Sequence, residues 1–150
     1  MQHKEINNSN RIATIGYEAK NSGYFIRQLI LHKVNCLVDV RNNAFSMKPG
    51  FSKKSLQRNL EKASIEYRHF KELGVEPKYR KNLDSKQKYR RLFAHYKKQL
   101  ETKGSALQEL MALIKNKKIA LMCFEVDKDY CHRSILAEKL RALGCGVEHI

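Results

Sequence analysis

The segment that decides the fold reads IALMCFEVDKDYCHRSILAEKLRAL and covers Ile119–Leu143. It begins with a short apolar run that ends at Cys123 and continues through a polar stretch. Apolar residues then recur at the spacing of one helix face. Gly144 follows at the place where a C-cap glycine is expected. The segment therefore predicts a buried strand, a loop and a helix.

The predicted start of that helix carries a thiol, an imidazole, a guanidinium and a hydroxyl in a row, from Cys131, His132, Arg133 and Ser134. The first backbone N–H groups of a helix lack helical partners, and the helix dipole favours negative charge there. A thiolate or a bound phosphate would be stabilised at this position. The alternative is a helix start that is polar without having a function.

Further strands and helices alternate along the chain. Strands are expected at Arg11–Ile15, Cys36–Val40, Ile65–Phe70 and Val147–Ile150. Helices are expected over Ser22–Lys33, after an N-cap at Ser52, over Tyr89–Leu100, and after a capping box formed by Ser105 and Gln108. Lys71–Lys86 is expected to be a long loop over a site. This alternation predicts a single-domain, three-layer α/β/α fold with a mostly parallel sheet of about five strands.

Length and composition indicate an ordered protein without a membrane span. The chain has 150 residues, of which 42% are hydrophobic, so we expect one α/β domain over residues 11–150 after a flexible tail of residues 1–10. No apolar run approaches the length of about 20 residues that a bilayer crossing needs. The polar N-terminus has no signal-peptide pattern, so a cytoplasmic location is expected. The four cysteines are then expected to be reduced.

The charge is strongly positive. The sequence contains 30 Lys and Arg residues against 15 Asp and Glu residues, a formal net charge of +15. The excess is concentrated in Lys78–Lys103. Such a balance favours contact with nucleic acid or with a phosphorylated substrate. A basic surface that only maintains solubility is the alternative.

Polar residues also gather at the carboxyl ends of the predicted strands, where ligands bind in open parallel sheets. They are Tyr17, Glu18, Arg41, Asn43, Lys48, His69, Cys123 and Glu125. We expect them to meet the helix start at one edge of the sheet. Arg41 could instead form an ion pair with Asp39 or Glu18, and Asp39 is interpreted as structural because a buried carboxylate needs a partner.

Three mechanisms could use these groups. In the first, Cys131 is a nucleophile and His69 carries its proton; His132 is a poorer partner because sequence neighbours on a helix do not face each other. In the second, a phosphate is held by Arg41, Arg133 and Lys48 while Glu18 or His69 acts as acid or base. In the third, Cys123, Cys131 and His132 bind a metal. Their spacing is not a common zinc pattern, and a fourth ligand would have to come from a distant residue such as His69, so no metal site is assigned. The sequence names no cofactor.

The expected site residues follow from these mechanisms. The catalytic candidates are Cys131, His69, Glu18 and Cys123. The candidates for binding the substrate or an anion are Tyr17, Arg41, Asn43, Lys48, His132, Arg133 and Ser134. The remaining cysteines, Cys36 and Cys145, are interpreted as structural.

Five motifs occur in order along nearly the whole chain: Thr14–Glu18, Leu37–Arg41, Lys48–Ser52, Leu73–Gly74 and Leu121–Leu136. On these motifs the sequence resembles the domain-of-unknown-function 488 (DUF488) family of small prokaryotic α/β proteins. The resemblance implies a compact α/β domain and supplies no reaction. It also implies which residues recur in the family, namely Tyr17, Glu18, Arg41, Cys123, Cys131, His132 and Arg133.

The sequence thus favours an enzyme with an anion-binding pocket at the strand carboxyl ends. Its substrate would carry a phosphate or derive from nucleic acid, and its chemistry would use Cys, His and Arg. Two alternatives stay open: a nucleic-acid-binding module without catalysis, and a metal or redox thiol protein. No membrane partner is expected.

Overall fold

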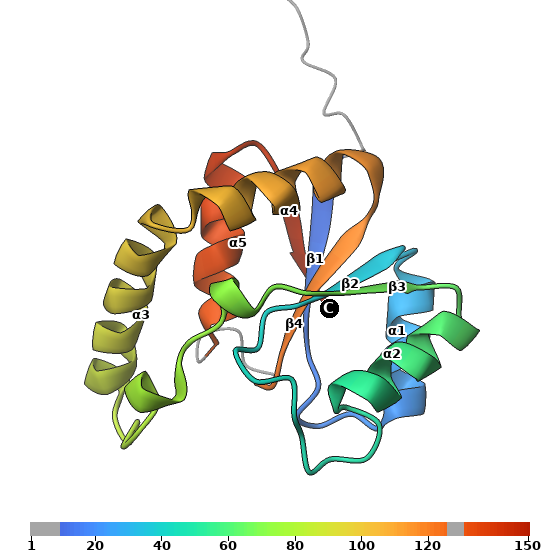
Figure 1. The fold of residues 1–150 in the computed structure, drawn as a ribbon, viewed down its shortest axis with the longest axis horizontal. Coiled ribbons are helices and arrows are strands. Elements are labelled where there is room, and N and C mark those ends of the chain that lie inside the picture. Colours follow the sequence, from blue (N-terminus) through green and yellow to red (C-terminus); the bar gives the residue numbers. More distant parts are fainter. Residues whose placement is uncertain (1–9, 126–130) are drawn as a thin grey trace, which may run out of the picture.

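The computed structural model describes residues 10–125 and 131–150, which are arranged around a five-stranded sheet (Figure 1). Every strand pairing is parallel, and the strand order is β3-β2-β4-β1-β5. The strands are β1 (Arg11–Gly16), β2 (Cys36–Asp39), β3 (Glu66–His69), β4 (Ile119–Cys123) and β5 (Gly146–His149). The predicted α/β fold with its parallel sheet is confirmed.

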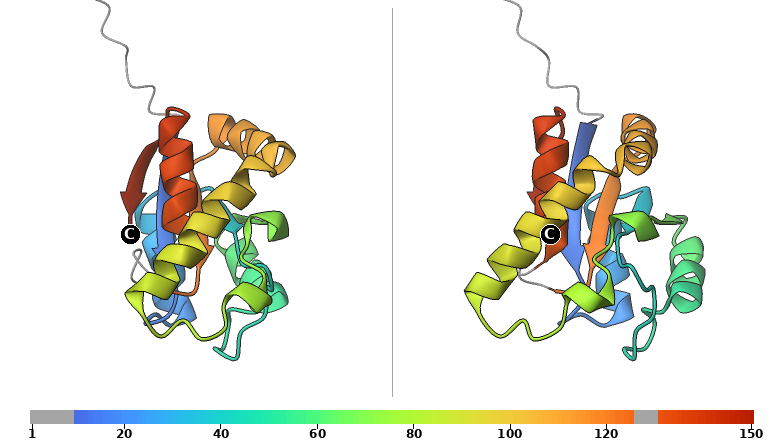
Figure 2. Two further views of the ribbon diagram at one scale, coloured as in Figure 1. Left: turned by 90° about the vertical axis from the view of Figure 1, so that its left-hand side faces the viewer. Right: turned by 60° about the vertical axis from the view of Figure 1, so that its left-hand side comes forward.

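Helices cover both faces of the sheet. One face packs against α1 (Ser22–Leu31) and α2 (Lys53–Lys62), and the other against α4 (Gly104–Asn116) and α5 (His132–Ala142). Helix α3 (Lys86–Glu101) lies across α5 (Figure 2). Strand β4 is buried along its whole length because Leu121 faces one helical layer while Met122 faces the other. A strand covered on both sides is apolar throughout, as the sequence indicated.

The connections place the end of β4 in an unusual position. After β1 and β2 the chain crosses to helices α1 and α2 on one face, whereas after β4 it crosses to α5 on the other. In the sheet, β4 lies between β2 and β1. The chain therefore leaves β4 toward one face of the sheet, whereas it leaves both neighbouring strands toward the other face. Ligands of open α/β sheets bind in the crevices at such switch points.

Several local predictions can be compared with the structure. The prediction that a capping box at Ser105 opens a helix is wrong. Helix α4 already begins at Gly104 with Lys103 as N-cap, because only a short link separates α4 from α3. Ser52 is the N-cap of α2, but its hydroxyl bonds to the backbone of Ser46 instead. Gly144 follows Leu143, the C-cap of α5, and has a φ of +101°, as predicted for the glycine that terminates this helix.

The segment predicted as a loop between β3 and α3 contains two short 3₁₀ helices, η2 (Lys71–Leu73) and η3 (Pro77–Tyr79). The expected flexible tail stays a prediction, since residues 1–9 lie outside the described residues. Within the described part of the chain, every helix is too short or too polar to span a bilayer.

Candidate functional site

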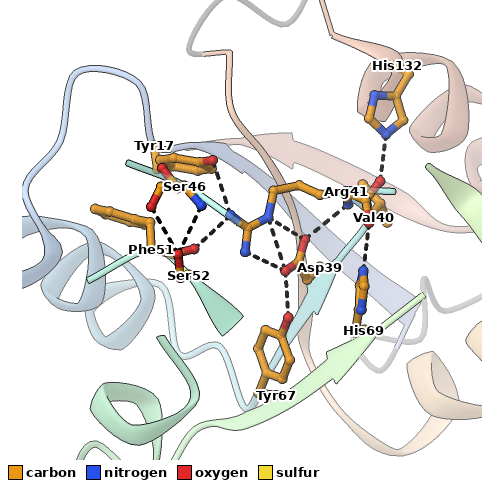
Figure 3. A network of polar contacts seen from close by, with 10 residues as sticks. All are labelled: Tyr17, Asp39, Val40, Arg41, Ser46, Phe51, Ser52, Tyr67, His69 and His132. Atoms are coloured by element: carbon orange, nitrogen blue, oxygen red, sulfur yellow. Dashed lines mark hydrogen bonds and ion pairs between the residues drawn. The ribbon is translucent and has the colours of Figure 1, made fainter. Parts of the chain in front are cut away.

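A buried ion pair fixes the end of β2 (Figure 3). The Asp39 side chain is fully buried, and that of Arg41 is 5% exposed. The Arg41 guanidinium donates to the Asp39 carboxylate from Nε at 2.9 Å and from Nη2 at 2.7 Å. The Tyr67 hydroxyl donates to the same carboxylate at 2.6 Å. Asp39 is therefore structural, as expected from the cost of burying an unpartnered carboxylate.

Arg41 connects three parts of the chain. Its Nη1 donates to the Phe51 carbonyl at 2.7 Å and to the Tyr17 hydroxyl at 3.2 Å. Burial alone would lower the pKa of Arg41, but the hydrogen bonds and charge of Asp39 raise it. All three guanidinium nitrogens are thus engaged within the protein. The structure supports the alternative that the sequence left open, an ion pair with Asp39, and gives Arg41 and buried Tyr17 a positioning role.

Two histidines flank the end of β2. His132 Nε2 lies 2.8 Å from the Val40 carbonyl, and His69 Nε2 lies 2.7 Å from the Arg41 carbonyl (Figure 3). Consecutive carbonyls of a strand point to opposite neighbours, so His69 lies on the β3 side and His132 on the β4 side. Because a carbonyl only accepts, each Nε2 donates a proton to it, and in the neutral ring of His132 the Nδ1 atom then remains as an acceptor. Burial lowers the pKa of His132 to about 4, with the charges of Arg80 and Arg133 acting in the same direction.

Cys123, Cys131 and His132 form a compact group that we call the thiol cluster. Cys123 is the last residue of β4 and Cys131 is the N-cap of α5. The two sulfurs form a disulfide, which corrects the expectation that all four cysteines are reduced. That expectation considered only the cellular compartment, whereas the packing of α5 on β4 brings these two sulfurs together. Cys36 and Cys145 are free and buried, in line with structural roles.

The thiol cluster also corrects the judgement that His132 is a poor partner for Cys131. One ligand atom from each of the three residues lies within 4.8 Å of the others. Cys131 has extended backbone angles, φ −126° and ψ 134°, because it precedes the first helical residue. The rule that helical neighbours face apart therefore does not apply to this pair. His69, the partner favoured from sequence, lies on the other side of β2.

Arg133 and Glu125 line the thiol cluster. The Arg133 backbone N–H donates to Cys131 Sγ at 3.5 Å, and its Nη1 donates to Cys123 Sγ at 3.3 Å and to the Glu125 carbonyl. The Glu125 carboxylate lies 3.5 Å from Cys123 Sγ and pairs with Arg80 at 2.8 Å. The two Arg133 donors, its backbone N–H and its guanidinium, stabilise cysteine sulfur in its anionic form.

Gly16 is required by this arrangement. A Cβ atom at Gly16 would overlap the Glu125 carbonyl and would lie 2.8 Å from Arg133 Nη1. The chain that leaves β4 therefore passes directly over the end of β1, its neighbour in the sheet.

Two lysine side chains lie at the carboxyl end of β1. Lys20 Nζ donates to the Gly16 carbonyl at 2.8 Å, and Lys48 Nζ donates to the carbonyls of Tyr17 and Glu18 at 2.8 and 2.7 Å. Burial lowers the pKa of Lys20, and the positive charges of Arg133 and Lys48 lower it further. Lys48 was predicted from the sequence. Lys20 was missed, although it lies in the loop that directly follows the predicted strand.

The remaining predicted residues are placed less centrally. Glu18 is exposed, and its backbone N–H donates to the Phe124 carbonyl at 2.9 Å. Asn43 is exposed in the loop after β2. The Ser134 hydroxyl donates to the Cys131 carbonyl at 2.8 Å, within the first turn of α5. The structure therefore brings together the thiol cluster, Arg133 and the lysines, with Arg41 and Tyr17 as support.

Comparison with known proteins agrees with the resemblance read from the motifs. A family model described as "Domain of unknown function DUF488" matches residues 23–140. Neither a search of curated proteins nor a search of solved structures gave a match. The matched region runs from the start of α1 to near the end of α5 and includes β2, β4 and the thiol cluster. The chain therefore belongs to the DUF488 family.

Proposed function

We propose that the protein is an enzyme that binds a phosphate-bearing substrate beside the carboxyl ends of β1 and β4. The observation that carries the proposal is that Lys20, Lys48 and Arg133 all lie against the backbone at the end of β1, at Gly16 and Tyr17. The hydrogen bonds of both lysine amino groups run to backbone carbonyls. Like charges held close together repel each other, and a bound anion relieves that repulsion.

Arg133 connects the cations to the reactive groups. Its guanidinium donates to Cys123 Sγ, and its charge is close enough to Lys20 to lower the pKa of that lysine. An anion held by the lysines is therefore adjacent to the thiol cluster. This adjacency favours catalysis over simple binding, because the substrate would lie beside sulfur, imidazole and carboxylate groups.

An apolar surface lies next to the cations. The Phe124 side chain is 41% exposed, and its ring meets the Tyr17 ring edge-on with 5.3 Å between centroids. The Lys48 amino group bonds to the Tyr17 carbonyl, so the apolar and cationic surfaces share one neighbour. A substrate that joins a phosphate to a planar group, such as a nucleotide, fits this combination.

The proposal is tested by calorimetric binding of nucleoside monophosphates and phosphorylated sugars, followed by mass spectrometry for turnover. Lys48→Gln should weaken binding about tenfold, since it removes a charge-assisted contact with phosphate. Lys115→Gln is the matched control, because exposed Lys115 lies near the end of α4, ahead of β4, at the opposite edge of the sheet. Equal binding by both variants, or no binding by the wild type, would refute the proposal.

A second candidate function is nucleic-acid binding, which a surface pocket of about 240 Å³ favours. The pocket is lined by Tyr79, Lys81, Leu83, Lys88, Arg91, Leu92 and His95. The rings of Tyr79 and His95 lie 4.3 Å apart between centroids. Aromatic rings among cations are typical of single-strand recognition. The affinity for a single-stranded oligonucleotide should then fall steeply with salt, and a flat salt dependence would exclude this function.

A further inference from the structure

We propose that Cys123, Cys131 and His132 form a metal site that takes a soft divalent cation of the Zn²⁺ type when the two cysteines are reduced. This inference does not depend on the proposed function, because it follows from the ligand atoms alone. All three side chains are buried, and one ligand atom of each lies within 4.8 Å of the other two. Two sulfurs and one imidazole nitrogen are donors that zinc prefers.

The orientation of His132 fits a ligand. Its Nε2 donates to the Val40 carbonyl at 2.8 Å, which leaves the unprotonated Nδ1 available. Histidines that bind metals usually donate their other ring N–H to a carbonyl or carboxylate, which fixes both the ring and its tautomer. The Val40 carbonyl therefore serves as the supporting contact that such a ligand requires.

The backbone spacing of the two cysteines fits separate thiolates. Their Cα atoms are 7.2 Å apart, whereas disulfides usually span about 4.4–6.8 Å. Once the disulfide is reduced, this Cα separation between the end of β4 and the start of α5 allows the two sulfurs to move apart and bind one cation between them. Arg133 donates to both sulfurs, from its backbone N–H and from its guanidinium, and so stabilises the charge that thiolates bring to a buried site.

Metal binding requires a balanced change of state. A thiol reductant supplies two electrons to the Cys123–Cys131 disulfide and is itself oxidised to a disulfide. The two cysteine thiols then lose their protons to solvent as the cation binds. Within residues 10–125 and 131–150, no further His, Cys, Asp or Glu joins the group.

The experiment compares the same full-length chain in two states. Reduced protein is loaded with Zn²⁺ under nitrogen, desalted and analysed for bound metal, and oxidised protein is treated identically. We expect about one zinc ion per reduced chain and almost none per oxidised chain. Cys131→Ser should weaken zinc binding at least about tenfold, whereas Cys36→Ser should bind like the wild type because Cys36 is a buried free thiol outside the cluster.

Cobalt provides a readout that needs no variant. Reduced wild type with Co²⁺ should show thiolate-to-cobalt charge-transfer absorption and the strong visible bands of tetrahedral coordination. Absence of these bands, or zinc bound equally by reduced and oxidised chains, would overturn the proposal. Lys48→Gln should still bind zinc fully, so loss of phosphate binding and loss of metal binding are separate results.

Discussion

Replacing Asp39 by asparagine should be severely destabilising. The substitution keeps the size of the side chain but leaves the Arg41 guanidinium, only 5% exposed, without a counter-charge. Breaking one side of a buried ion pair costs about 3–5 kcal/mol. For a chain of this length, each kcal/mol lowers Tm by about 2–4 °C, so Asp39→Asn should melt about 10 °C below the wild type.

The assay is urea unfolding followed by far-ultraviolet circular dichroism, with thermal melts as a second measure. Tyr67→Phe is the matched comparison, because it removes one hydrogen bond to the same carboxylate and leaves the ion pair intact. Tyr67→Phe should lower the free energy of unfolding by about 1.5–3 kcal/mol, because hydrogen bonds to charged groups contribute about that much to stability. This loss is smaller than the loss expected for Asp39→Asn.

A double variant separates charge from packing. Asp39→Asn combined with Arg41→Met removes the unpaired buried charge. The double variant should therefore lose less free energy of unfolding than the sum of the losses of the two single variants. The reasoning fails if Asp39→Asn costs under about 1 kcal/mol, or if the two substitutions are simply additive.

Three further substitutions test other parts of the structure. Tyr96→Phe removes the hydroxyl that donates to the Leu73 carbonyl at 2.6 Å and should cost about 1–3 kcal/mol in urea unfolding; an unchanged midpoint would contradict that contact. Leu121→Ala, at a fully buried position of β4, should lower the free energy of unfolding by about 2–5 kcal/mol in the same assay. A smaller loss would mean that neighbouring side chains fill the cavity. Gly16→Ala should displace the chain that leaves β4, so in reduced protein Cys123 should be alkylated faster than in the wild type; equal rates by peptide mass spectrometry would refute the close contact.

Much of the fold could be predicted because periodicity and strand ends are local properties of the sequence. The apolar run at Ile119 and the helical spacing after Cys131 correspond to β4 and α5. The strand order could not be predicted, since β1 pairs with β4 more than a hundred residues later in the chain. That pairing is what places Gly16 beneath the Glu125 carbonyl and Lys20 near Arg133.

The candidate site was predictable by residue type and less so by role. Arg41 and Tyr17 were assigned to anion binding, yet each is buried and serves the ion pair with Asp39. Sequence position cannot distinguish a cation that faces a ligand from one that faces a buried carboxylate. The preference for His69 over His132 assumed that Cys131 is helical, whereas Cys131 precedes the first helical residue.

The two histidine contacts at the end of β2 have a consequence for comparing sequences. His132 and His69 bond to the main-chain oxygens of Val40 and Arg41, so no side chain at position 40 takes part. Natural variation at that position among apolar residues would leave the imidazole directions intact. A single-residue insertion or deletion in β2 would instead turn the oxygens toward the opposite neighbours and misdirect both rings. The length of β2 therefore sets the direction of both imidazoles, whichever apolar side chain stands at position 40.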